Sequence, residues 1–403
     1  MSATAPQHPR VLHVITILSV GGVEVWLTAL LRHIESLERD RLPHETFDIL
    51  MTGGKRGDLD DLAASLGATL HYLPFSRRNL PAFAGSFRKL LRERKYSAIH
   101  DHQDYSAGWH FLAGAGELPP IRIVHVHNPP ARLRVESRSA LRRMGLRVSA
   151  GLVRRFATHV LGTSSQILEQ YGFKRKQFPR QSIRTLHCGF EVADFNESFD
   201  GANRSVCAEL EWPHPAKLAL FVGRLDGFDP SRPGWNHKNP QFALEVARLA
   251  LERDPDLRFV MVGGGGDVQA QLESKVREWG LSDRISLVGR RLDVARFMAA
   301  AHTLIFPSLE EGLGMVAVEA QAAGLHVLAS DAVPREAVVL PELVKFLPLS
   351  AGAEAWCTEL LKQLSLPRYD ASVAAEKVKR SPYSVAESYR RLHSIYGSAD
   401  DAA

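Results

Sequence analysis

The sequence alternates short apolar runs with longer amphipathic stretches, and this rhythm occurs twice along the chain. In the first half, seven apolar runs are predicted to be strands, at residues 11–15, 47–51, 69–73, 98–100, 121–126, 159–161 and 183–186. Five more follow in the second half, at residues 218–222, 258–262, 285–288, 304–306 and 327–330. Strands that alternate with helical patterns in this way form parallel sheets covered by helices on both faces.

A polar stretch over 197–217 separates the two series of strands. We therefore predict an α/β protein with two doubly wound, Rossmann-like domains facing a cleft, one over residues 1–205 and one over residues 215–380. The alternative is one large α/β sheet. The last apolar pattern, over residues 385–396, is predicted to be a terminal helix within the segment 381–403.

Composition excludes several classes of protein. The three cysteines, Cys188, Cys207 and Cys357, have neither CxxC nor paired metal-ligand spacing, which argues against a disulfide scaffold or a zinc finger. No apolar run approaches the roughly 18 residues of a membrane span, and no signal peptide is visible, so a cytoplasmic address is expected. The net charge of +5 hints at an anionic partner.

Three turns after predicted strands have the residues of an anion site. Gly21 and Gly22 lie between a strand and a helix, where glycines let a backbone approach a phosphate. Gly223-Arg224 closes a strand of the second half, and Lys238 follows after a loop. A glycine run over 263–266 follows the next strand. Each alone is equally consistent with an ordinary tight turn or a surface cation.

The segment 307–320 points most directly to a ligand. It follows a buried apolar strand, its loop carries Glu311, and a helix is predicted to begin near Gly314. Gly312 and Gly314 leave the N–H groups of the first helical turn accessible to phosphate oxygens. Glu319 comes eight residues after Glu311 in an otherwise apolar run, and helix capping by acids does not explain it.

Together these motifs resemble those of glycosyltransferase family 4, which comprises retaining enzymes with the GT-B fold and includes exopolysaccharide and capsular polysaccharide glycosyltransferases. Glu311 and Glu319 match the family's E-x7-E signature. The likeness covers almost the whole chain and includes Gly-Gly-x-Glu at 21–24, Val-Gly-Arg-Leu at 222–225, Lys238-Asn239, the glycines at 263–266, Val-Gly-Arg at 288–290 and the run 330–336. In this fold the terminal helix returns to the N-terminal domain.

The resemblance assigns a role to each matching residue. Glu311 contacts the hydroxyls of the donor sugar, Glu319 contacts the ribose, and His127 lies near the reacting carbon. The donor diphosphate is bound by Arg224 and Lys238, by Gly21 and Gly22, and by the N–H groups of Gly312, Leu313, Gly314, Met315 and Val316. Gly289 and Arg290 present backbone to the nucleobase. One departure is the 13 residues between Arg224 and Lys238, more than the family usually has.

Other polar residues lie near His127. His100, Asp101, His102 and Asp104, with His125, have the residue types of metal ligands, but a polar acceptor-binding edge or ordinary surface histidines are the alternatives that the sequence favours. The family handles the diphosphate with cations and helix N–H groups, so no metal and no other cofactor is expected.

Basic residues are concentrated in the first half. Residues 1–200 hold 27 basic and 19 acidic residues, a net charge of +8, whereas the remainder has a net charge of −3. An amphipathic helical pattern in this region places Leu141, Met144, Val148, Leu152 and Phe156 on one apolar face. Its arginines are candidate contacts for an anionic membrane or acceptor, namely Arg138, Arg142, Arg143, Arg147, Arg154 and Arg155. Solvated arginines on an ordinary packed helix are the alternative.

The sequence thus predicts a retaining glycosyltransferase that moves a sugar from a nucleotide-diphosphate donor to a glycan or lipid-linked acceptor. The enzyme is expected in the cytoplasm, peripheral to the inner face of the membrane. Glu311, His127, Arg224 and Lys238 are its candidate catalytic residues. Alternatives are a sugar phosphorylase or nucleotide-sugar epimerase of the same fold, or a non-catalytic nucleotide-binding membrane adaptor. Nucleic acid is not expected as a partner, because no nucleic-acid module accompanies the arginines.

Overall fold

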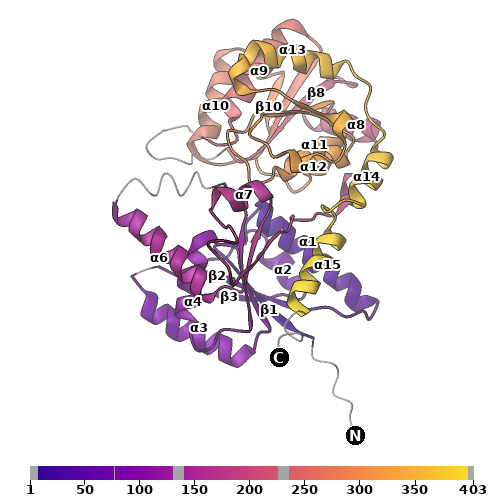
Figure 1. The fold of residues 1–403 in the computed structure, drawn as a ribbon. Coiled ribbons are helices and arrows are strands. Elements are labelled where there is room, and N and C mark those ends of the chain that lie inside the picture. Colours follow the sequence, from indigo (N-terminus) through magenta and orange to yellow (C-terminus); the bar gives the residue numbers. More distant parts are fainter. Residues whose placement is uncertain (1–7, 77, 130–139, 226–235, 398–403) are drawn as a thin grey trace. The chain divides into compact units, whose positions relative to one another are not determined.

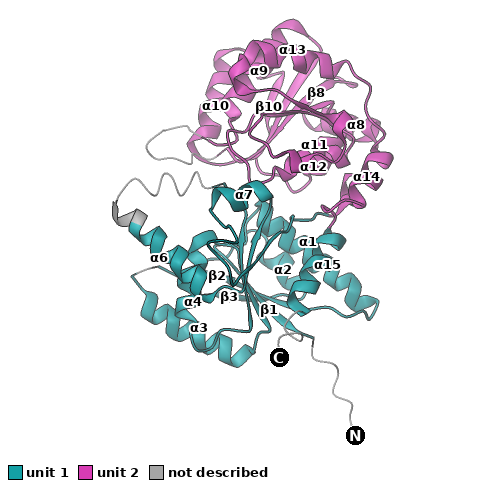
Figure 2. Cartoon of the chain, in the orientation of Figure 1, with its two compact units in different colours: residues 1–190, 385–403 teal, residues 191–384 magenta. Residues whose placement is uncertain are grey.

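The chain forms two compact units, shown in a computed structural model that describes residues 8–76, 78–129, 140–225 and 236–397 (Figures 1 and 2). Unit 1 comprises residues 1–190 and 385–403, and unit 2 comprises residues 191–384. Each unit has its own parallel sheet, so the alternative of one large sheet is wrong. Most of the loop between Arg224 and Lys238 lies outside the described residues.

Unit 1 contains a seven-stranded sheet in the order β3-β2-β1-β4-β5-β6-β7. The strands are β1 (Arg10–Ile15), β2 (Thr46–Met51), β3 (Thr69–Tyr72), β4 (Ala98–Asp101), β5 (Ile121–Val126), β6 (His159–Gly162) and β7 (Ser182–Thr185). All neighbours pair in parallel. The order reverses between β1 and β4, and the crevice beside such a reversal is where ligands of doubly wound folds bind.

Helices connect these strands and cover the sheet (Figure 1). They are α1 (Gly22–Arg39), α2 (Asp60–Ser65), α3 (Leu80–Arg94), α4 (Ala107–Ala113), α6 (Ala140–Phe156), α7 (Ser165–Gln170) and the terminal α15 (Val385–Tyr396). The apolar face of α1 includes the buried Trp26 and Leu30. Hydrophobic burial of this kind contributes about 25 cal/mol per Å² of apolar surface and holds each helix on the sheet.

The terminal helix α15 belongs to unit 1 although unit 2 precedes it in the sequence. It packs against α1, where the Trp26 indole N–H donates to the Ser388 hydroxyl at 3.0 Å. The Tyr389 hydroxyl donates to the buried carboxylate of Glu45 at 2.6 Å. The N–H of Val385 donates to the carbonyl of Phe190 at 3.0 Å, so the chain leaves unit 1 and re-enters it at one point.

Unit 2 contains a six-stranded parallel sheet in the order β10-β9-β8-β11-β12-β13, whose reversal lies between β8 and β11. Its strands are β8 (Lys217–Val222), β9 (Leu257–Val262), β10 (Ile285–Leu287), β11 (Thr303–Phe306), β12 (His326–Ala329) and β13 (Val344–Phe346). Its helices are α8 (Phe199–Glu209), α9 (Pro240–Arg253), α10 (Gly266–Glu278), α11 (Val294–Ala300), α12 (Met315–Ala322), α13 (Gly352–Leu364) and α14 (Ala371–Lys379).

The boundary between the units differs from the predicted one. Helix α8 was assigned in large part to a first domain ending at residue 205, but it packs on α11 and lies in unit 2. Its buried Asn203 explains the placement, because the side-chain amide donates to the carbonyls of Ala216 and Ala300 at 3.0 and 2.9 Å. Unit 2 also extends past residue 380 to residue 384.

Candidate functional site

In unit 2, three loops that follow β8, β9 and β10 meet at the carboxyl edge of the sheet. The N–H of Gly263 donates to the carbonyl of Gly289 at 2.8 Å, and the N–H of Leu225 donates to the carbonyl of Gly264 at 3.4 Å. A Cβ on Gly263 would lie 1.8 Å from the carbonyl oxygen of Gly223, and its φ is +138°, so only glycine fits there. The glycines therefore pack the backbone of these loops together beside Arg224.

Arg224 and Lys238 are brought together by Asn236 despite the residues between them. The Asn236 amide donates to the carbonyl of Arg224 at 2.7 Å, and its oxygen accepts from the N–H of Lys238 at 2.7 Å. The aliphatic stem of Lys238 would contact a Cβ on Gly223 at 3.2 Å. The length of the intervening loop thus does not separate the two cations, because Asn236, which is 3% exposed, holds both ends.

Glu311 lies in the loop after β11 and pairs with Lys238. Its Oε1 atom accepts from the ammonium of Lys238 at 2.7 Å and from the hydroxyl of Ser308 at 2.6 Å. Within the described residues, both hydrogen bonds of this carboxylate go to Oε1 and Oε2 makes none. Ser308 is itself held by Ser330, whose hydroxyl donates to the Ser308 carbonyl at 2.5 Å. One oxygen of Glu311 is thus fixed, and the other is available to a ligand.

Helix α12 begins directly after this loop without a side-chain cap. Gly314 is its N-cap residue in the left-handed conformation, with φ +90°, and none of the described side chains accepts from the first-turn N–H groups. A Cβ on Gly314 would lie 3.0 Å from the Phe306 ring. Gly312 and Leu313 are buried, whereas Met315 and Val316 are partly exposed at the helix start. Uncapped N–H groups and the helix dipole favour an anion at this position.

Burial at this edge shifts the pKa of two residues, His237 and Glu319. Burial, and then the positive charges of Lys238 and Arg224, lower the pKa of His237 to about 3. Burial raises the pKa of Glu319 to about 7, and Lys238 partly opposes this rise. Glu319 lies in the second turn of α12. Burial is thus the main cause of both shifts, and the cations lower the pKa of each group, the direction expected from positive charge.

In unit 1, Gly21 is the N-cap of α1 and precedes Gly22. A Cβ on Gly21 would meet the carboxylate of Glu24 at 2.5 Å, whereas a Cβ on Gly22 would meet nothing within 4 Å. The Glu24 side chain is flexible and Gly21 has an extended φ of −155°, so this contact alone does not require glycine at Gly21. No distance in the fold requires glycine at Gly22, where open space would admit a ligand or a side chain.

Five buried or partly buried histidines lie in β1, β4 and β5 or directly after them, and we call them the histidine layer: His13, His100, His102, His125 and His127. Each of His100, His102, His125 and His127 has its ring centroid within 6.3 Å of that of Trp26. Burial, followed in four of the five by the other histidines of the layer, lowers the pKa of each; for His125 the further cause is His187. The layer is consequently neutral at ordinary pH.

One row of the layer has a fixed direction. A backbone carbonyl only accepts, so Nε2 of His125 carries a hydrogen and donates it to the carbonyl of Leu186 at 3.2 Å. Nδ1 of His125 then accepts from Nε2 of His100 at 3.2 Å, and Nδ1 of His100 accepts from the hydroxyl of Tyr396 at 2.8 Å. This row ties the end of α15 to the sheet.

The other row ends at His127. Nδ1 of His13 lies 3.0 Å from Nε2 of His102, and Nδ1 of His102 lies 2.9 Å from Nε2 of His127. Nδ1 of His127 lies 3.5 Å from the sulfur of Cys188. Both ring nitrogens of His127 are therefore engaged by neighbours in unit 1. Nε2 of His13 is buried without a hydrogen-bond partner among the described residues.

The histidines of this region are close enough to hold a metal ion, but the aspartates of the proposed ligand set are not among them. Ligand nitrogens of His13, His100 and His102 lie within 4.8 Å of one another, as do those of His102, His125 and His127. Neither aspartate of the proposed ligand set belongs to these groups, and Oδ2 of Asp101 instead accepts from Nδ1 of His110 at 2.6 Å. The imidazoles already bond each other, so a metal would have to replace these hydrogen bonds.

The arginine-rich helix α6 leaves part of its apolar face exposed. Met144 and Val148 are 58% and 45% exposed, whereas Ser149 and Val153 are buried. A Cβ on Gly108 of α4 would lie 2.5 Å from the carbonyl oxygen of Ser149, so the glycine permits the close packing of the two helices. The apolar face named from the sequence is therefore not packed as a whole, because Met144 and Val148 lie outside the buried stripe.

The basic side chains of α6 are only partly described. Arg147, Arg154 and Arg155 are exposed. Arg142 and Arg143 lie in the helix without described side chains, and Arg138 lies outside the described residues. Among the described residues, none of the helices combines the length and the apolar character needed to cross a bilayer.

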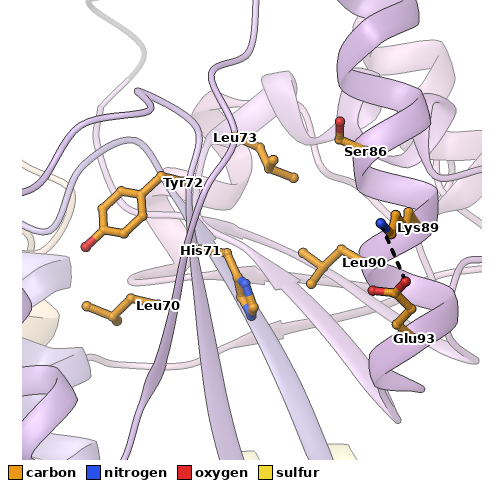
Figure 3. A pocket seen from close by; sticks show the side chains of 8 residues that line it. All are labelled: Leu70, His71, Tyr72, Leu73, Ser86, Lys89, Leu90 and Glu93. Atoms are coloured by element: carbon orange, nitrogen blue, oxygen red, sulfur yellow. Dashed lines mark ion pairs between the residues drawn. The ribbon is translucent and has the colours of Figure 1, made fainter.

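A surface hollow of unit 1 lies between β3 and α3 (Figure 3). It is lined by Leu70, His71, Tyr72, Leu73, Ser86, Lys89, Leu90 and Glu93. Its histidine is engaged from behind, since Nε2 of His71 bonds the buried Oδ2 of Asp48 at 3.0 Å. None of the predicted site residues lines this hollow.

Sequence reasoning missed Ser308 and Asn236. The signal for Ser308 was its place between a strand end and the E-x7-E segment. Asn236 stands two residues before Lys238, where an Asx side chain can bond the backbone N–H two residues on. Neither position alone shows which partner the side chain selects.

Comparison with known proteins agrees with this architecture. The family model for a glycosyl transferase 4-like domain matches residues 9–189, and that for glycosyl transferases group 1 matches residues 216–362. Glycosyltransferase EpsF of Bacillus subtilis is 25% identical over 96% of both chains. The capsular polysaccharide biosynthesis glycosyltransferase CapH of Staphylococcus aureus is 25% identical over 80% of this chain and 81% of its own.

Solved structures with the same fold include HepE of Anabaena in complex with UDP-glucose. It has a TM-score of 0.72 and 17% identity, and the alignment covers 97% of this chain and 100% of that chain. Sucrose-phosphate synthase of Thermosynechococcus elongatus has a TM-score of 0.71 and 20% identity, over 98% and 100% of the two chains. The fold is thus GT-B, as predicted. The chain belongs to glycosyltransferase family 4 and is a glycosyltransferase.

Proposed function

We propose that the protein is a retaining glycosyltransferase that uses a nucleotide-diphosphate sugar and acts in exopolysaccharide or capsule synthesis. The observation that carries the donor proposal is the arrangement of Lys238, Arg224 and Glu311 at the uncapped start of α12. Cations and N–H groups there suit a diphosphate, and the available Oε2 of Glu311 suits a sugar hydroxyl. Names of relatives support the pathway, since CapH is a capsular polysaccharide enzyme.

The reaction consists of one exchange at the sugar's anomeric carbon. The bond from this carbon to the diphosphate oxygen breaks, and the bond to the acceptor oxygen forms on the same face. The acceptor's proton passes to an oxygen of the departing phosphate. In this proposal Arg224, Lys238 and the N–H groups of residues 314–316 stabilise the leaving charge, while Glu311 positions the sugar. Gly289 and Arg290 border the nucleobase and Glu319 the ribose.

The donor proposal is tested by thermal shift with UDP-, GDP- and ADP-sugars, followed by transfer assays with the donor that stabilises the protein. Glu311→Ala and Arg224→Ala should lose most transfer while keeping the wild-type melting temperature. Retention is read from the anomeric configuration of the product by NMR, and an inverted product overturns that part. Absence of stabilisation by every sugar nucleotide contradicts the donor proposal.

His127 is proposed as the histidine of unit 1 that lies near the reacting carbon. Because its Nε2 bonds His102 and its Nδ1 bonds Cys188, a sugar hydroxyl reaches a ring nitrogen only in exchange for one of these neighbours. Gly21 and Gly22 are proposed to admit the diphosphate on the same unit. We also propose that no metal is needed.

Helix α6 supports a proposal for the acceptor. Met144 and Val148 are exposed on the same helix as Arg147, Arg154 and Arg155, which is the composition of a helix that lies on an anionic membrane. We propose that α6 brings unit 1 to a lipid-linked acceptor at the inner face of the membrane, and that Arg138, Arg142 and Arg143 add to this charge.

Flotation with phosphatidylglycerol vesicles tests the membrane proposal. Binding should fall with added salt, and it should be lost when Arg147, Arg154 and Arg155 are changed to Gln. The matched control changes three exposed arginines elsewhere on unit 1, Arg32, Arg39 and Arg41, to Gln. Equal loss of binding in both triple variants would indicate a response to net charge alone and contradict a role for α6.

A further inference from the structure

The ion pair between Lys238 and Glu311 joins two groups that, in the proposed function, serve different parts of one ligand. Lys238 would bind the diphosphate and Glu311 the sugar, yet their Nζ and Oε1 atoms are 2.7 Å apart. The side chains are 17% and 6% exposed, so the pair is poorly solvated and its attraction is little screened. Any diphosphate that binds Lys238 therefore competes with Glu311.

The surroundings of the pair allow Lys238 to leave without displacing Glu311. Oε1 of Glu311 accepts from the Ser308 hydroxyl as well as from Lys238. Ser308 is fully buried, and Ser330 holds its carbonyl. When the ammonium turns to a phosphate, Ser308 continues to hold Oε1, and Oε2 keeps its direction.

The exchange of partners by Lys238 costs free energy when the diphosphate carries no sugar. If Lys238 binds a diphosphate that carries no sugar, the buried carboxylate of Glu311 loses its cation and gains no partner. A donor that carries a sugar supplies hydroxyl groups to the same carboxylate, which offset the loss. The pair therefore couples recognition of the two parts of the donor.

We propose that Glu311 is a negative determinant for nucleoside diphosphates without sugar, because it competes with the diphosphate for Lys238. This rests on the proposed donor site. It makes the site favour the intact donor over the product diphosphate, which differs from the donor in lacking the sugar. Release of the product is then assisted by re-formation of the Lys238–Glu311 ion pair.

The test measures binding by calorimetry, with the nucleoside diphosphate and the sugar nucleotide of the base that the wild-type protein binds, UDP being the first probe. Glu311→Gln keeps the shape of the side chain and the acceptance from Ser308. We expect this variant to bind UDP about 5- to 10-fold more tightly than the wild type. Its preference for the sugar nucleotide over UDP should fall, and transfer should be lost.

A double-mutant cycle separates competition for Lys238 from general repulsion of the phosphates by Glu311. In the Lys238→Gln background, Glu311→Gln should leave UDP affinity unchanged within about twofold. The same tightening in both backgrounds would overturn the proposal, because Glu311 would then act by its charge alone. Unchanged or weaker UDP binding by Glu311→Gln would also overturn it.

The outcomes distinguish failure of the proposed function from failure of the proposed competition for Lys238. If the wild-type protein binds no nucleoside diphosphate and no sugar nucleotide, the proposed function fails. If it binds both and the cycle shows no coupling between Lys238 and Glu311, the proposed function stands and the competition is rejected. The melting temperature of each variant confirms that it is folded before binding is measured.

Discussion

The carboxyl edge of the sheet in unit 1 carries neutral imidazoles that bond one another, whereas the same edge in unit 2 carries cations and carboxylates. In unit 1 the row from Tyr396 through His100 and His125 ends on a carbonyl, and its protons have one direction. In unit 2 Lys238 donates to the carboxylate of Glu311, which also accepts a hydrogen bond from Ser308. Protonation of the histidine layer is therefore unfavourable, whereas Lys238 can exchange Glu311 for another anion while Ser308 keeps the carboxylate in place.

This difference separates structural from ligand-binding polarity within one fold. A neutral row with fixed donors and acceptors stabilises the packing, and protonation of any of its rings would break one of its hydrogen bonds. A partly buried ion pair is a weak source of stability, since desolvation offsets much of its attraction. Its presence at a strand end is better explained by a charged ligand.

The largest effect is expected from Lys238→Ala, which removes a cation from the strand ends of unit 2. Sugar transfer should fall about 100- to 1000-fold, the loss typical when one preorganised group that stabilises transition-state charge is deleted. Initial rates at saturating donor measure it. Lys377→Ala, which deletes an exposed lysine paired with Glu342, is the control in the same unit. Equal rates in the two variants would count against the site.

Acid should weaken unit 1, because burial lowers the pKa of His13 and of His125 to about 3. Above pH 6.5 neither the folded nor the unfolded chain protonates these histidines. Below it the unfolded chain binds the protons and the folded unit does not, so stability is lost as pH falls toward 3. At pH 5 the loss is roughly 2 kcal/mol for each of the two.

Urea unfolding of His13→Asn at pH 7.5 and pH 5.0 measures this loss. The difference in unfolding free energy between the two pH values should shrink by roughly 2 kcal/mol relative to wild type. An unchanged pH dependence in His13→Asn would show that the layer accepts protons in the folded state.

Glu319 should respond to pH in the opposite direction. Burial raises the pKa of its carboxyl to about 7, above the ordinary 4.5, so it contributes stability below pH 4.5 that is lost as pH rises through 7. Glu319→Gln should therefore stabilise the protein at pH 8 by about 1–2 kcal/mol and have little effect at pH 4.5. Thermal unfolding at both pH values measures the effect, and equal stabilisation at both contradicts it.

Tyr396→Phe tests the directed row of unit 1. It removes the donor to Nδ1 of the buried His100, and an unsatisfied buried acceptor should cost about 1 kcal/mol. Urea unfolding measures the cost. Tyr369→Phe removes an exposed hydroxyl that bonds Lys377 and should change stability by less. A smaller loss in Tyr396→Phe than in the control would show that the row contributes nothing.

The smallest effect is expected from chelation. In the proposed mechanism Arg224, Lys238 and the start of α12 meet the diphosphate charge, so EDTA should leave the transfer rate unchanged. Rates with and without added Mg²⁺ and Mn²⁺ complete the measurement. Loss of activity in EDTA, restored by one metal, would overturn the metal-free proposal and direct attention to the histidine layer.

The strands were predictable because both faces of each central strand are buried and their residues form continuous apolar runs. The exception is β13, whose Val344-Lys345-Phe346 is short and has no buried residue, so its pattern resembles a loop. The motif residues Arg224 and Glu311 could be named from spacing. Their partners Asn236 and Ser308 could not, because side-chain hydrogen bonds depend on rotamers and on loops that meet only in the fold.

Helix α6 shows a different limit. Its periodicity identified a helix, but periodicity does not reveal which stripe packs inward. The small Gly108 on α4 admits the backbone at Ser149 and so selects that side. Met144 and Val148 then remain outside, although their hydropathy favours burial.

The hydrogen bond between Val385 and Phe190 makes unit 2 an insertion into unit 1, with both ends of the insert at one point. A ribosome therefore completes all of unit 2 before it synthesises α15. Until that helix emerges, the nascent first unit lacks the partners of Trp26 and Glu45, and His100 lacks the Tyr396 hydroxyl. Domains commonly fold as units during synthesis, so here the second unit along the chain is the first that can finish folding.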